Sequence, residues 1–222
     1  MTSLFVTGTD TGVGKTQVAS ALISLLKQRG QRVAGMKPIA SGCHITSDGL
    51  RNDDALVLNQ QANVQLNYDD INPYAFELPI APHIAAKKVG VEIDASVIHR
   101  QFYQIQKKAD SVVVEGAGGW FVPINNKLTM ADVAIRLGLP VVLVVGIRLG
   151  CINHALLTVE AIKCSGLPFY GWVANNIVEN TESDAIVESL KDRILAPCLG
   201  VVPVLSASQL VMDHITLLDS GK

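Results

Sequence analysis

A glycine-rich segment near the N-terminus has the residue types of a phosphate-binding loop. Its sequence is Gly8-Thr9-Asp10-Thr11-Gly12-Val13-Gly14-Lys15-Thr16, between the apolar run Ser3 to Val6 and a helical pattern that begins at Lys15. Backbone N–H groups in such a loop bind phosphate oxygens, the lysine reaches the β- and γ-phosphates, and the threonine hydroxyl binds Mg²⁺. The segment therefore predicts a site for a nucleoside triphosphate.

The spacing of this loop differs from the usual one, in which four residues separate the first glycine from Gly-Lys-Ser/Thr. Thr9 holds the first position, and the nearest upstream glycine, Gly8, makes the spacing five. The order of strand, Gly-Lys-Thr and helix still favours a phosphate-binding loop over a glycine-rich turn.

Two acidic positions are candidates for holding a metal ion. Glu115 ends an apolar run and precedes Gly116-Ala117-Gly118-Gly119, so its carboxylate is expected beside the phosphate loop, where it would bind Mg²⁺. The alternative for Glu115 is a solvent-exposed acid at a strand end. Asp54 follows Asp53 at the start of a helical pattern, where a carboxylate either caps the helix or binds the metal. The residues leave both roles of Asp54 open.

Three further segments carry polar groups. Lys37 and Ser41 frame a loop directly after an apolar run, where a lysine stabilises phosphoryl charge or an anionic substrate, or is simply exposed. The segment from Gly150 to Asn153 precedes a helical pattern whose free N–H groups suit a carboxylate. Asn175-Asn176 offers donors and acceptors for an adenine edge, or forms only a turn.

Cys151 and His154 are spaced as a possible nucleophile and base on one helical turn, but no acid that would orient the histidine is evident. We therefore disfavour this pair as a catalytic unit. His83 is expected in a loop or at a helix start.

Short β-branched runs alternate with helical patterns along the chain. The predicted strands are Leu4 to Val6, Arg32 to Met36, Ser111 to Glu115, Val141 to Val145, Tyr170 to Ala174 and Gly200 to Val204. The predicted helices are Lys15 to Gln28, Asp53 to Gln61, Asp94 to Lys107, Thr129 to Leu137, Ile152 to Cys164 and Glu182 to Arg193. This alternation predicts an α/β fold with a mainly parallel central sheet and helices on both faces. Ligands of such folds lie at the carboxyl ends of the strands, where the candidate residues fall.

The bulk properties fit one enzyme domain over residues 1–222, because 49% hydrophobic residues suffice for a single core. A net charge of −2 argues against a nucleic-acid partner. The four cysteines form no CxxC pair, so neither a disulfide framework nor a zinc site is expected, as is typical of the reducing cytoplasm. The longest apolar run, Leu139 to Val145, is far shorter than the roughly 20 residues of a membrane-spanning helix, so no membrane partner is expected.

Taken together and in order, these motifs closely resemble those of the dethiobiotin synthetase family of P-loop NTPases. The matching segments are Gly8 to Thr16, Lys37 to Gly42, Asn52 to Ala55, Val114 to Trp120, Leu149 to Ala155 and Gly171 to Asn175. The match extends to about residue 205, and the tail 206–222 matches nothing we can place. The acid-free segment Ser206-Ala207-Ser208-Gln209 offers no carboxylate for the ribose hydroxyls.

The resemblance implies an ATP-dependent ligase of biotin synthesis. It implies that CO₂ (or bicarbonate) is joined to 7,8-diaminononanoate, that a cyclic urea closes, and that ADP and phosphate are released. A homodimer is also implied, in which the substrate carboxylate is received by residues 150–153 of the neighbouring chain.

The resemblance further implies the role of each site residue. Lys15 and Lys37 are expected to be catalytic, and Thr16, Asp54 and Glu115 to hold Mg²⁺. ATP is expected to contact Asp54, Glu115 and these residues: Gly12, Val13, Gly14, Lys15, Thr16, Gln17, Gly116, Ala117, Gly118, Gly119, Asn175, Asn176, Pro203, Val204 and Leu205. The diamine substrate is expected to contact Thr11, Lys37, Ser41, Gly150, Cys151 and Asn153.

Two other P-loop functions are alternatives. An ATP-dependent amidoligase normally carries a glutamine-amidotransferase domain, for which 222 residues leave no room. A dimeric ATPase switch of the ParA/MinD type needs a second lysine early in its phosphate loop, and Thr9, Asp10 and Thr11 provide none.

Overall fold

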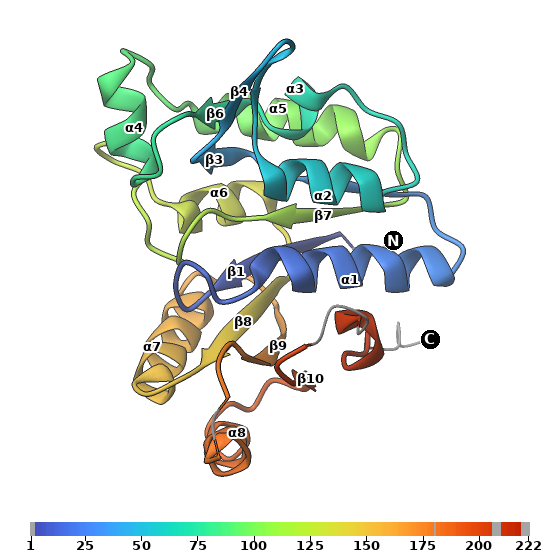
Figure 1. Ribbon diagram of the computed structural model, residues 1–222, viewed down its shortest axis with the longest axis vertical. Helices are drawn as coiled ribbons and strands as arrows, with labels where there is room; N and C mark the ends of the chain where they lie inside the picture. Colours follow the sequence, from blue (N-terminus) through green and yellow to red (C-terminus); the bar gives the residue numbers. More distant parts are fainter. Residues whose placement is uncertain (1–2, 180, 206–209, 219–222) are drawn as a thin grey trace.

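A computed structural model describes residues 3–179, 181–205 and 210–218 (Figure 1). Within these ranges six strands form the central sheet, and every adjacent pair is parallel. In spatial order the strands are β10 (Cys198–Val202), β9 (Phe169–Asn176), β8 (Val141–Ile147), β1 (Leu4–Gly8), β7 (Ser111–Glu115) and β2 (Val33–Met36). The predicted fold class and all six predicted strands are confirmed. The acid-free segment Ser206 to Gln209 lies outside the described residues.

Alternating residues of the central strands enter two separate cores, one on each face of the sheet. Phe5 and Val114 belong to one core, whereas Leu4, Val6 and Val113 belong to the other. Burial on both faces explains why these strands are continuous apolar runs. The register places Val6 beside Glu115, so the end of β7 lies next to the segment that leads into the phosphate loop.

The six predicted helices cover the two faces of the sheet (Figure 1). On one face, α1 (Lys15–Gln28) and α2 (Asp53–Gln61) pack on the core that contains Leu4. The other face is covered by α5 (Ala95–Gln106), α6 (Met130–Leu137), α7 (Cys151–Cys164) and α8 (Ser183–Lys191). Helix α7 begins one residue before the predicted start at Ile152, and α8 ends two residues before the predicted end at Arg193.

Between β2 and α5 the chain forms several short elements that the sequence patterns do not predict. They are β3 (Ile39–Ser41) paired in parallel with β6 (Tyr74–Phe76), the hairpin of β4 (His44–Thr46) and β5 (Gly49–Arg51), and the helices α3 (Tyr68–Ile71) and α4 (Pro82–Lys88). A 3-10 helix, η1 (Val211–Asp213), follows β10. Segments of three to seven residues are too short to show a helical or strand period. The elements between β2 and α5 build the upper part of the molecule in Figure 1, whereas η1 lies below α1 near the C-terminal end.

His83 is the second residue of α4, as expected for a residue at a helix start. Of the helices in the described ranges, none is both long and apolar enough to cross a lipid bilayer.

Candidate functional site

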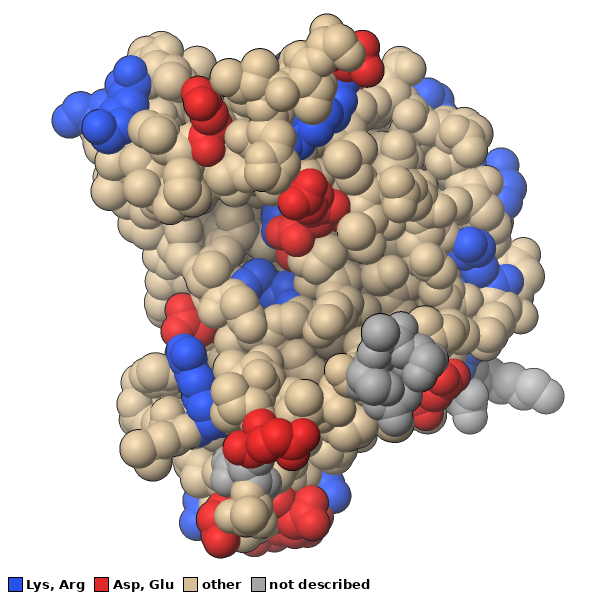
Figure 2. Space-filling view, in the orientation of Figure 1, with Lys and Arg blue, Asp and Glu red and all other residues tan. Residues whose placement is uncertain are grey.

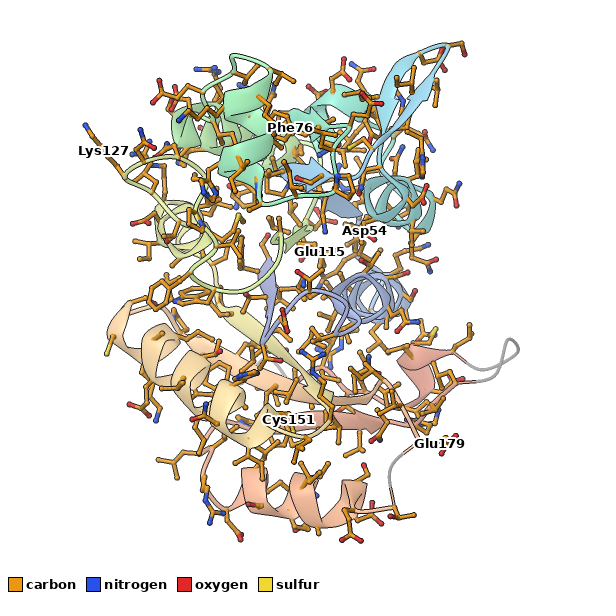
Figure 3. The ribbon with its side chains drawn as sticks, turned by 60° about the vertical axis from the view of Figure 1, so that its left-hand side comes forward. Asp54, Phe76, Glu115, Lys127, Cys151 and Glu179 are labelled. Carbon is orange, nitrogen blue, oxygen red and sulfur yellow. The ribbon has the colours of Figure 1, made fainter. Side chains whose placement is uncertain are left out.

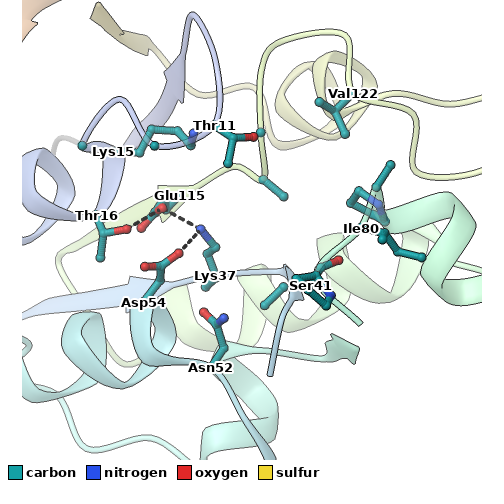
Figure 4. A pocket seen from close by; sticks show the side chains of 18 of the residues that line it. Thr11, Lys15, Thr16, Lys37, Ser41, Asn52, Asp54, Ile80, Glu115 and Val122 are labelled. Atoms are coloured by element: carbon teal, nitrogen blue, oxygen red, sulfur yellow. Dashed lines mark hydrogen bonds and ion pairs between the residues drawn. The ribbon is translucent and has the colours of Figure 1, made fainter. Parts of the chain in front are cut away.

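A cavity of about 680 Å³ opens at the carboxyl ends of β1, β2 and β7 (Figure 4). Its walls come from the phosphate loop, the start of α2, the loop after β7, and the segment that leads into α4. The predicted site residues that line it are Thr11, Gly12, Gly14, Lys15, Thr16, Gln17, Lys37, Ser41, Asp54, Glu115, Ala117 and Gly118. The cavity therefore lies at the edge of the sheet where ligands of parallel α/β folds are expected to bind.

A cluster of opposite charges lies at the base of this cavity. Lys37 Nζ is 2.6 Å from Glu115 Oε1 and 2.9 Å from Asp54 Oδ2. Thr16 Oγ1 donates a hydrogen bond to the same Glu115 oxygen at 2.9 Å. These contacts are drawn in Figure 4, and Figure 3 shows Asp54 and Glu115 together near the middle of the molecule. The cluster joins the start of α1, the start of α2 and the ends of β2 and β7.

The burial of this cluster decides three alternatives that the sequence leaves open. Lys37 is only 4% exposed and Glu115 only 1%, so the readings of an exposed lysine and an exposed acid are wrong. The residue that caps α2 is Asn52, whose Oδ1 accepts a hydrogen bond from the Ala55 N–H at 3.2 Å. Asp54 is therefore not the helix cap, and its carboxylate faces Lys37 instead.

The charges of the cluster shift the pKa values of its members. Burial alone lowers the pKa of Lys37, but the attraction of Glu115 and Asp54 outweighs it and raises the pKa above its usual value. Burial alone raises the pKa of Asp54, but the charge of Lys37 outweighs it and lowers the pKa. Burial, followed by repulsion from Lys37, lowers the pKa of Lys15 to about 8. Lys37 is thus held in its charged form, whereas the Lys15 ammonium begins to lose its proton at mildly alkaline pH.

The phosphate loop is tightly constrained. Gly14 has φ of 90°, and a Cβ there would collide with the Asn175 amide. That amide donates a hydrogen bond to the Val13 carbonyl at 2.9 Å. Lys15 Nζ donates to the Asp10 carbonyl at 2.8 Å, and the Asp10 carboxylate pairs with Arg148. The loop conformation therefore depends on glycine at position 14 and on a strand far away in the sequence.

A smaller cavity of about 270 Å³ adjoins the loop on its other side. It is lined by Gly12, Gly14, Gln17, Asn175, Asn176, Ile177, Pro203, Val204 and Leu205. The two asparagines are the last residues of β9, so the reading of Asn175-Asn176 as a turn is wrong. All five residues predicted on the nucleotide-base side (Asn175, Asn176, Pro203, Val204 and Leu205) thus meet in one pocket next to the phosphate loop.

Several predicted residues line neither of these two cavities. Val13 is a buried residue of the loop, and Gly116 and Gly119 flank the lining residues Ala117 and Gly118 in the sequence. The segment Gly150 to Asn153 lies at the start of α7, and Figure 3 shows Cys151 there, apart from Asp54 and Glu115.

The start of α7 corrects one expectation, that the Cys151 N–H is free, and agrees with another, that Cys151 and His154 are not a catalytic pair. The Cys151 N–H donates to the Arg148 carbonyl at 3.0 Å, so it is not free for a carboxylate. Its side chain is buried in the core while His154 is exposed, which argues against a nucleophile and base pair.

Other polar residues around the site are not predicted by the sequence patterns. Asn52, Tyr68 and Asn72 form hydrogen bonds behind Lys37 and Asp54, and the Asp10–Arg148 pair supports the phosphate loop. The short helix α3 has no periodic signal, and long-range partners cannot be read from one sequence. An asparagine three residues before Ala55 was a usable signal for the α2 cap.

The donor set around Lys37 suits a hard divalent cation. Glu115 Oε2 is buried and has no hydrogen-bond partner within the described part of the chain, and Asp54 and Thr16 add two further oxygen ligands. In that part of the chain no group of three or more His, Cys, Asp or Glu side chains could hold a metal ion. A metal here would therefore also need oxygens from a ligand or water.

Comparisons with known proteins agree with these features. Residues 2–209 match the family model described as "AAA domain". The chain is 49% identical over 208 residues to the ATP-dependent dethiobiotin synthetase BioD of Pseudomonas paraeruginosa, covering 93% of this chain and 91% of that protein. It is 49% identical over 224 residues to the protein of the same name from Cellvibrio japonicus, covering 98% of each.

Among solved structures, the chain is similar to the MinC:MinD cell division protein complex of Aquifex aeolicus. The TM-score is 0.58 at 16% identity, over 91% of this chain and 81% of the other. At this identity the similarity shows the P-loop NTPase-like fold alone.

Proposed function

Because the chain belongs to the ATP-dependent dethiobiotin synthetase family and is an ATP-dependent ligase of biotin synthesis, we propose that its larger cavity joins CO₂ to 7,8-diaminononanoate. The products are dethiobiotin, ADP and phosphate. The observation that carries this proposal is the meeting of two lysines with two carboxylates and a threonine hydroxyl in one cavity beside a phosphate loop. We treat residues 1–222 as one ligase domain, and we place the reaction in the cytoplasm because it consumes ATP.

The two cavities divide the substrates between them. The adenine occupies the smaller cavity beside Asn175 and Pro203, and the phosphates follow the loop from Gly12 to Thr16. The terminal phosphate then points into the larger cavity, toward Lys15 and Lys37. The diamine lies in the rest of that cavity, between Thr11 of the phosphate loop and Ser41.

The reaction proceeds in three steps. One substrate amine attacks CO₂, loses a proton and becomes a carbamate. A carbamate oxygen then attacks the γ-phosphorus of ATP, ADP leaves, and a mixed carbamic-phosphoric anhydride forms. The second amine attacks the anhydride carbonyl, phosphate leaves, and the cyclic urea closes with loss of a proton. No covalent enzyme intermediate is needed, so positioning and electrostatics supply the catalysis.

Each polar side chain has a distinct task in this scheme. Lys37 is held charged, so it stabilises the carbamate and the charge that develops on the transferred phosphoryl group. Lys15 binds the β- and γ-phosphate oxygens. The Ser41 hydroxyl is buried without a hydrogen-bond partner among the described residues, so it is available to orient the carbamate.

Thr16, Asp54 and Glu115 would hold Mg²⁺, which supplies positive charge that neutralises the phosphates of ATP. The ammonium of Lys37 now binds the same two carboxylates. Because Asp54 and Glu115 already bind one positively charged group, this contact supports their assignment as ligands of Mg²⁺.

The substrate tail extends toward a second copy of the chain. Leu149 is completely exposed beside Gly150, and Phe121, in the loop after β7, and Leu157, on α7, are each more than 60% exposed. Figure 2 shows a hollow on the side of the molecule between the segments of α4 and α7. A homodimer through this side buries the apolar side chains. It also brings the N–H groups of Ile152 and Asn153 and the Asn153 side chain to the substrate carboxylate of the neighbour.

The experiment that tests this function follows labelled bicarbonate into an acid-stable product. We expect incorporation that requires both ATP and 7,8-diaminononanoate, with one ADP formed for each product molecule. Hydrolysis of ATP without incorporation contradicts the proposal and favours an ATPase switch.

A further inference from the structure

Both backbone polar groups of Lys37 are bound by the end of helix α3. The Lys37 N–H donates to the Ile71 carbonyl at 3.0 Å, and Asn72 Nδ2 donates to the Lys37 carbonyl at 2.7 Å. Lys37 lies between β2 and β3 and belongs to neither strand, so these two bonds take the place of a sheet ladder. The backbone position of Lys37 is therefore set by two consecutive residues of another segment.

The same asparagine is connected to helix α2. Asn72 Oδ1 accepts a hydrogen bond from the Tyr68 hydroxyl at 3.0 Å, and that hydroxyl accepts one from the Asn52 N–H at 2.7 Å. Asn52 in turn caps α2, whose second residue is Asp54. A continuous chain of hydrogen bonds thus links the Lys37 carbonyl to the turn that carries Asp54.

This chain of hydrogen bonds is largely shielded from water, although the Tyr68 residue in the middle of it is only half-buried. Asn52 and Asn72 are both buried, and the Arg51 guanidinium lies 4.2 Å from the centre of the Tyr68 ring. A fully satisfied polar network in a buried place holds its members in one arrangement more strictly than exposed contacts do.

We propose that Asn72 and Tyr68 are positioning residues, which hold the Lys37 backbone and the first turn of α2 in the relative placement that phosphoryl transfer needs. The inference rests on the proposed function, because it takes Lys37 and Asp54 as members of the reaction site. The ion pair between these two side chains cannot serve this purpose during turnover, since both groups then bind substrate or cation. The hydrogen bonds behind them use no group assigned to the substrate or the cation, so the reaction does not require them to break.

The decisive variant is Tyr68→Phe, which removes one hydroxyl and leaves the ring against Arg51. We expect kcat to fall about tenfold, because small misplacements of reacting groups are costly in rate. KM for ATP is expected to stay within about twofold of its value in the unmodified protein, because Tyr68 lines neither cavity. Tyr103→Phe is the matched control: its side chain is 53% exposed on α5, and its rate is expected to be unchanged.

Hydrogen–deuterium exchange of the nucleotide-free protein provides a readout that does not depend on catalysis. In Tyr68→Phe, the peptide covering the start of α2 is expected to exchange faster, because the Asn52 N–H loses its acceptor. The peptide covering the phosphate loop is expected to be unchanged. Asn72→Ala removes both links and is expected to lower kcat further, and Tyr68→Phe alone decides the question if Asn72→Ala does not fold.

The inference is overturned if Tyr68→Phe has the same kcat as Tyr103→Phe. It is also overturned if Tyr68→Phe is partly unfolded at the assay temperature and regains normal kcat at a lower temperature at which it is fully folded, because the rate loss would then reflect only unfolded protein. Comparison with Lys37→Met separates this failure from a failure of the proposed function. An inactive Lys37→Met beside a fully active Tyr68→Phe overturns only the positioning role. A fully active Lys37→Met overturns the proposed function and this inference with it.

Discussion

The ammonium of Lys37 lies 2.6 Å from Oε1 of Glu115, and both side chains are almost completely shielded from solvent. Removing one member of a buried ion pair leaves the other as an uncompensated charge in a poorly hydrated place. Asp54 contacts the same ammonium, but its side chain is 41% exposed. If Lys37 were removed, water would therefore stabilise the charge of Asp54 far better than the charge of the buried Glu115. Lys37 and Glu115 are therefore expected to depend on each other for folding as well as for catalysis.

Lys37→Met tests both consequences, because it keeps most of the apolar stem and removes the charge. We expect the free energy of unfolding to fall by about 3–5 kcal/mol, since Glu115 loses its partner. Turnover at saturating substrate is expected to fall roughly 10²–10⁴-fold, the size of an electrostatic contribution to the transition state. Urea unfolding and the bicarbonate assay measure the two effects.

The double variant Lys37→Met with Glu115→Gln is the control for this experiment. It is expected to regain much of the lost stability, because no buried charge is left unpaired, and to remain inactive. Near-normal turnover in Lys37→Met would remove Lys37 from the mechanism.

Asp54→Asn tests the metal assignment. We expect the Mg²⁺ concentration for half-maximal activity to rise about tenfold or more, because a neutral amide oxygen replaces a charged ligand. Asp53→Asn is a matched control next to it, since Asp53 is exposed and pairs with the exposed His44 at 3.3 Å, away from Lys37. An Asp54→Asn protein whose Mg²⁺ requirement equals that of Asp53→Asn would show that Asp54 does not bind the metal.

The lowered pKa of Lys15 predicts a pH dependence of nucleotide binding. With a pKa of about 8, Lys15 is charged below that pH and loses its charge as the pH rises through it. The Kd of ATP, measured by calorimetry with a chelator present, is expected to rise above about pH 8, by up to about tenfold per pH unit. Lys15→Arg keeps its charge at every pH in this range, so its Kd should not rise in this way. An equal rise in both proteins would assign the titration to another group.

Asn175→Ala tests the adenine pocket. Asn175 lines the smaller cavity and also holds the Val13 carbonyl, so its loss is expected to weaken the binding of every nucleotide through the loop. If Asn175 also reads the base, ATP should lose more affinity than GTP, by about tenfold. Equal losses for the two nucleotides would restrict Asn175 to the support of the loop.

Complementation tests the shared active site of the proposed homodimer. Lys15→Met and Gly150→Glu are each expected to be inactive, because the first lesion lies in the ATP site and the second in the site for the neighbour's substrate carboxylate. A Cβ at Gly150 meets no atom within 4 Å, so the added side chain has room, although φ of 89° adds strain.

After equal mixing and subunit exchange, half of the dimers are heterodimers with one intact site of two, so about a quarter of normal turnover should return. Exchange shown by mass spectrometry without recovered activity would contradict a site shared between subunits.

The long strands and helices, and the edge of the sheet that carries the candidate site, follow from the sequence alone. Continuous apolar runs such as Val141 to Val145 identify buried parallel strands, and the glycines and Lys15 identify the phosphate loop. Because the carboxyl ends of parallel strands meet at one edge, Lys37, Glu115 and Asn175 could be assigned to the same region without coordinates. These signals are local, so one sequence is enough to recognise them.

The contacts between these residues, in contrast, depend on the three-dimensional packing of the chain. The Thr16–Glu115 contact joins residues 99 positions apart, and the Asn72–Lys37 contact joins residues 35 apart. Helix α3, which supplies Asn72, is four residues long and shows no periodicity. Whether Lys37 was exposed or buried, and whether Asp54 capped a helix or met a lysine, depended on which segments pack together. Such packing is a property of the whole chain, because a buried charge is stable only where a distant segment brings its partner.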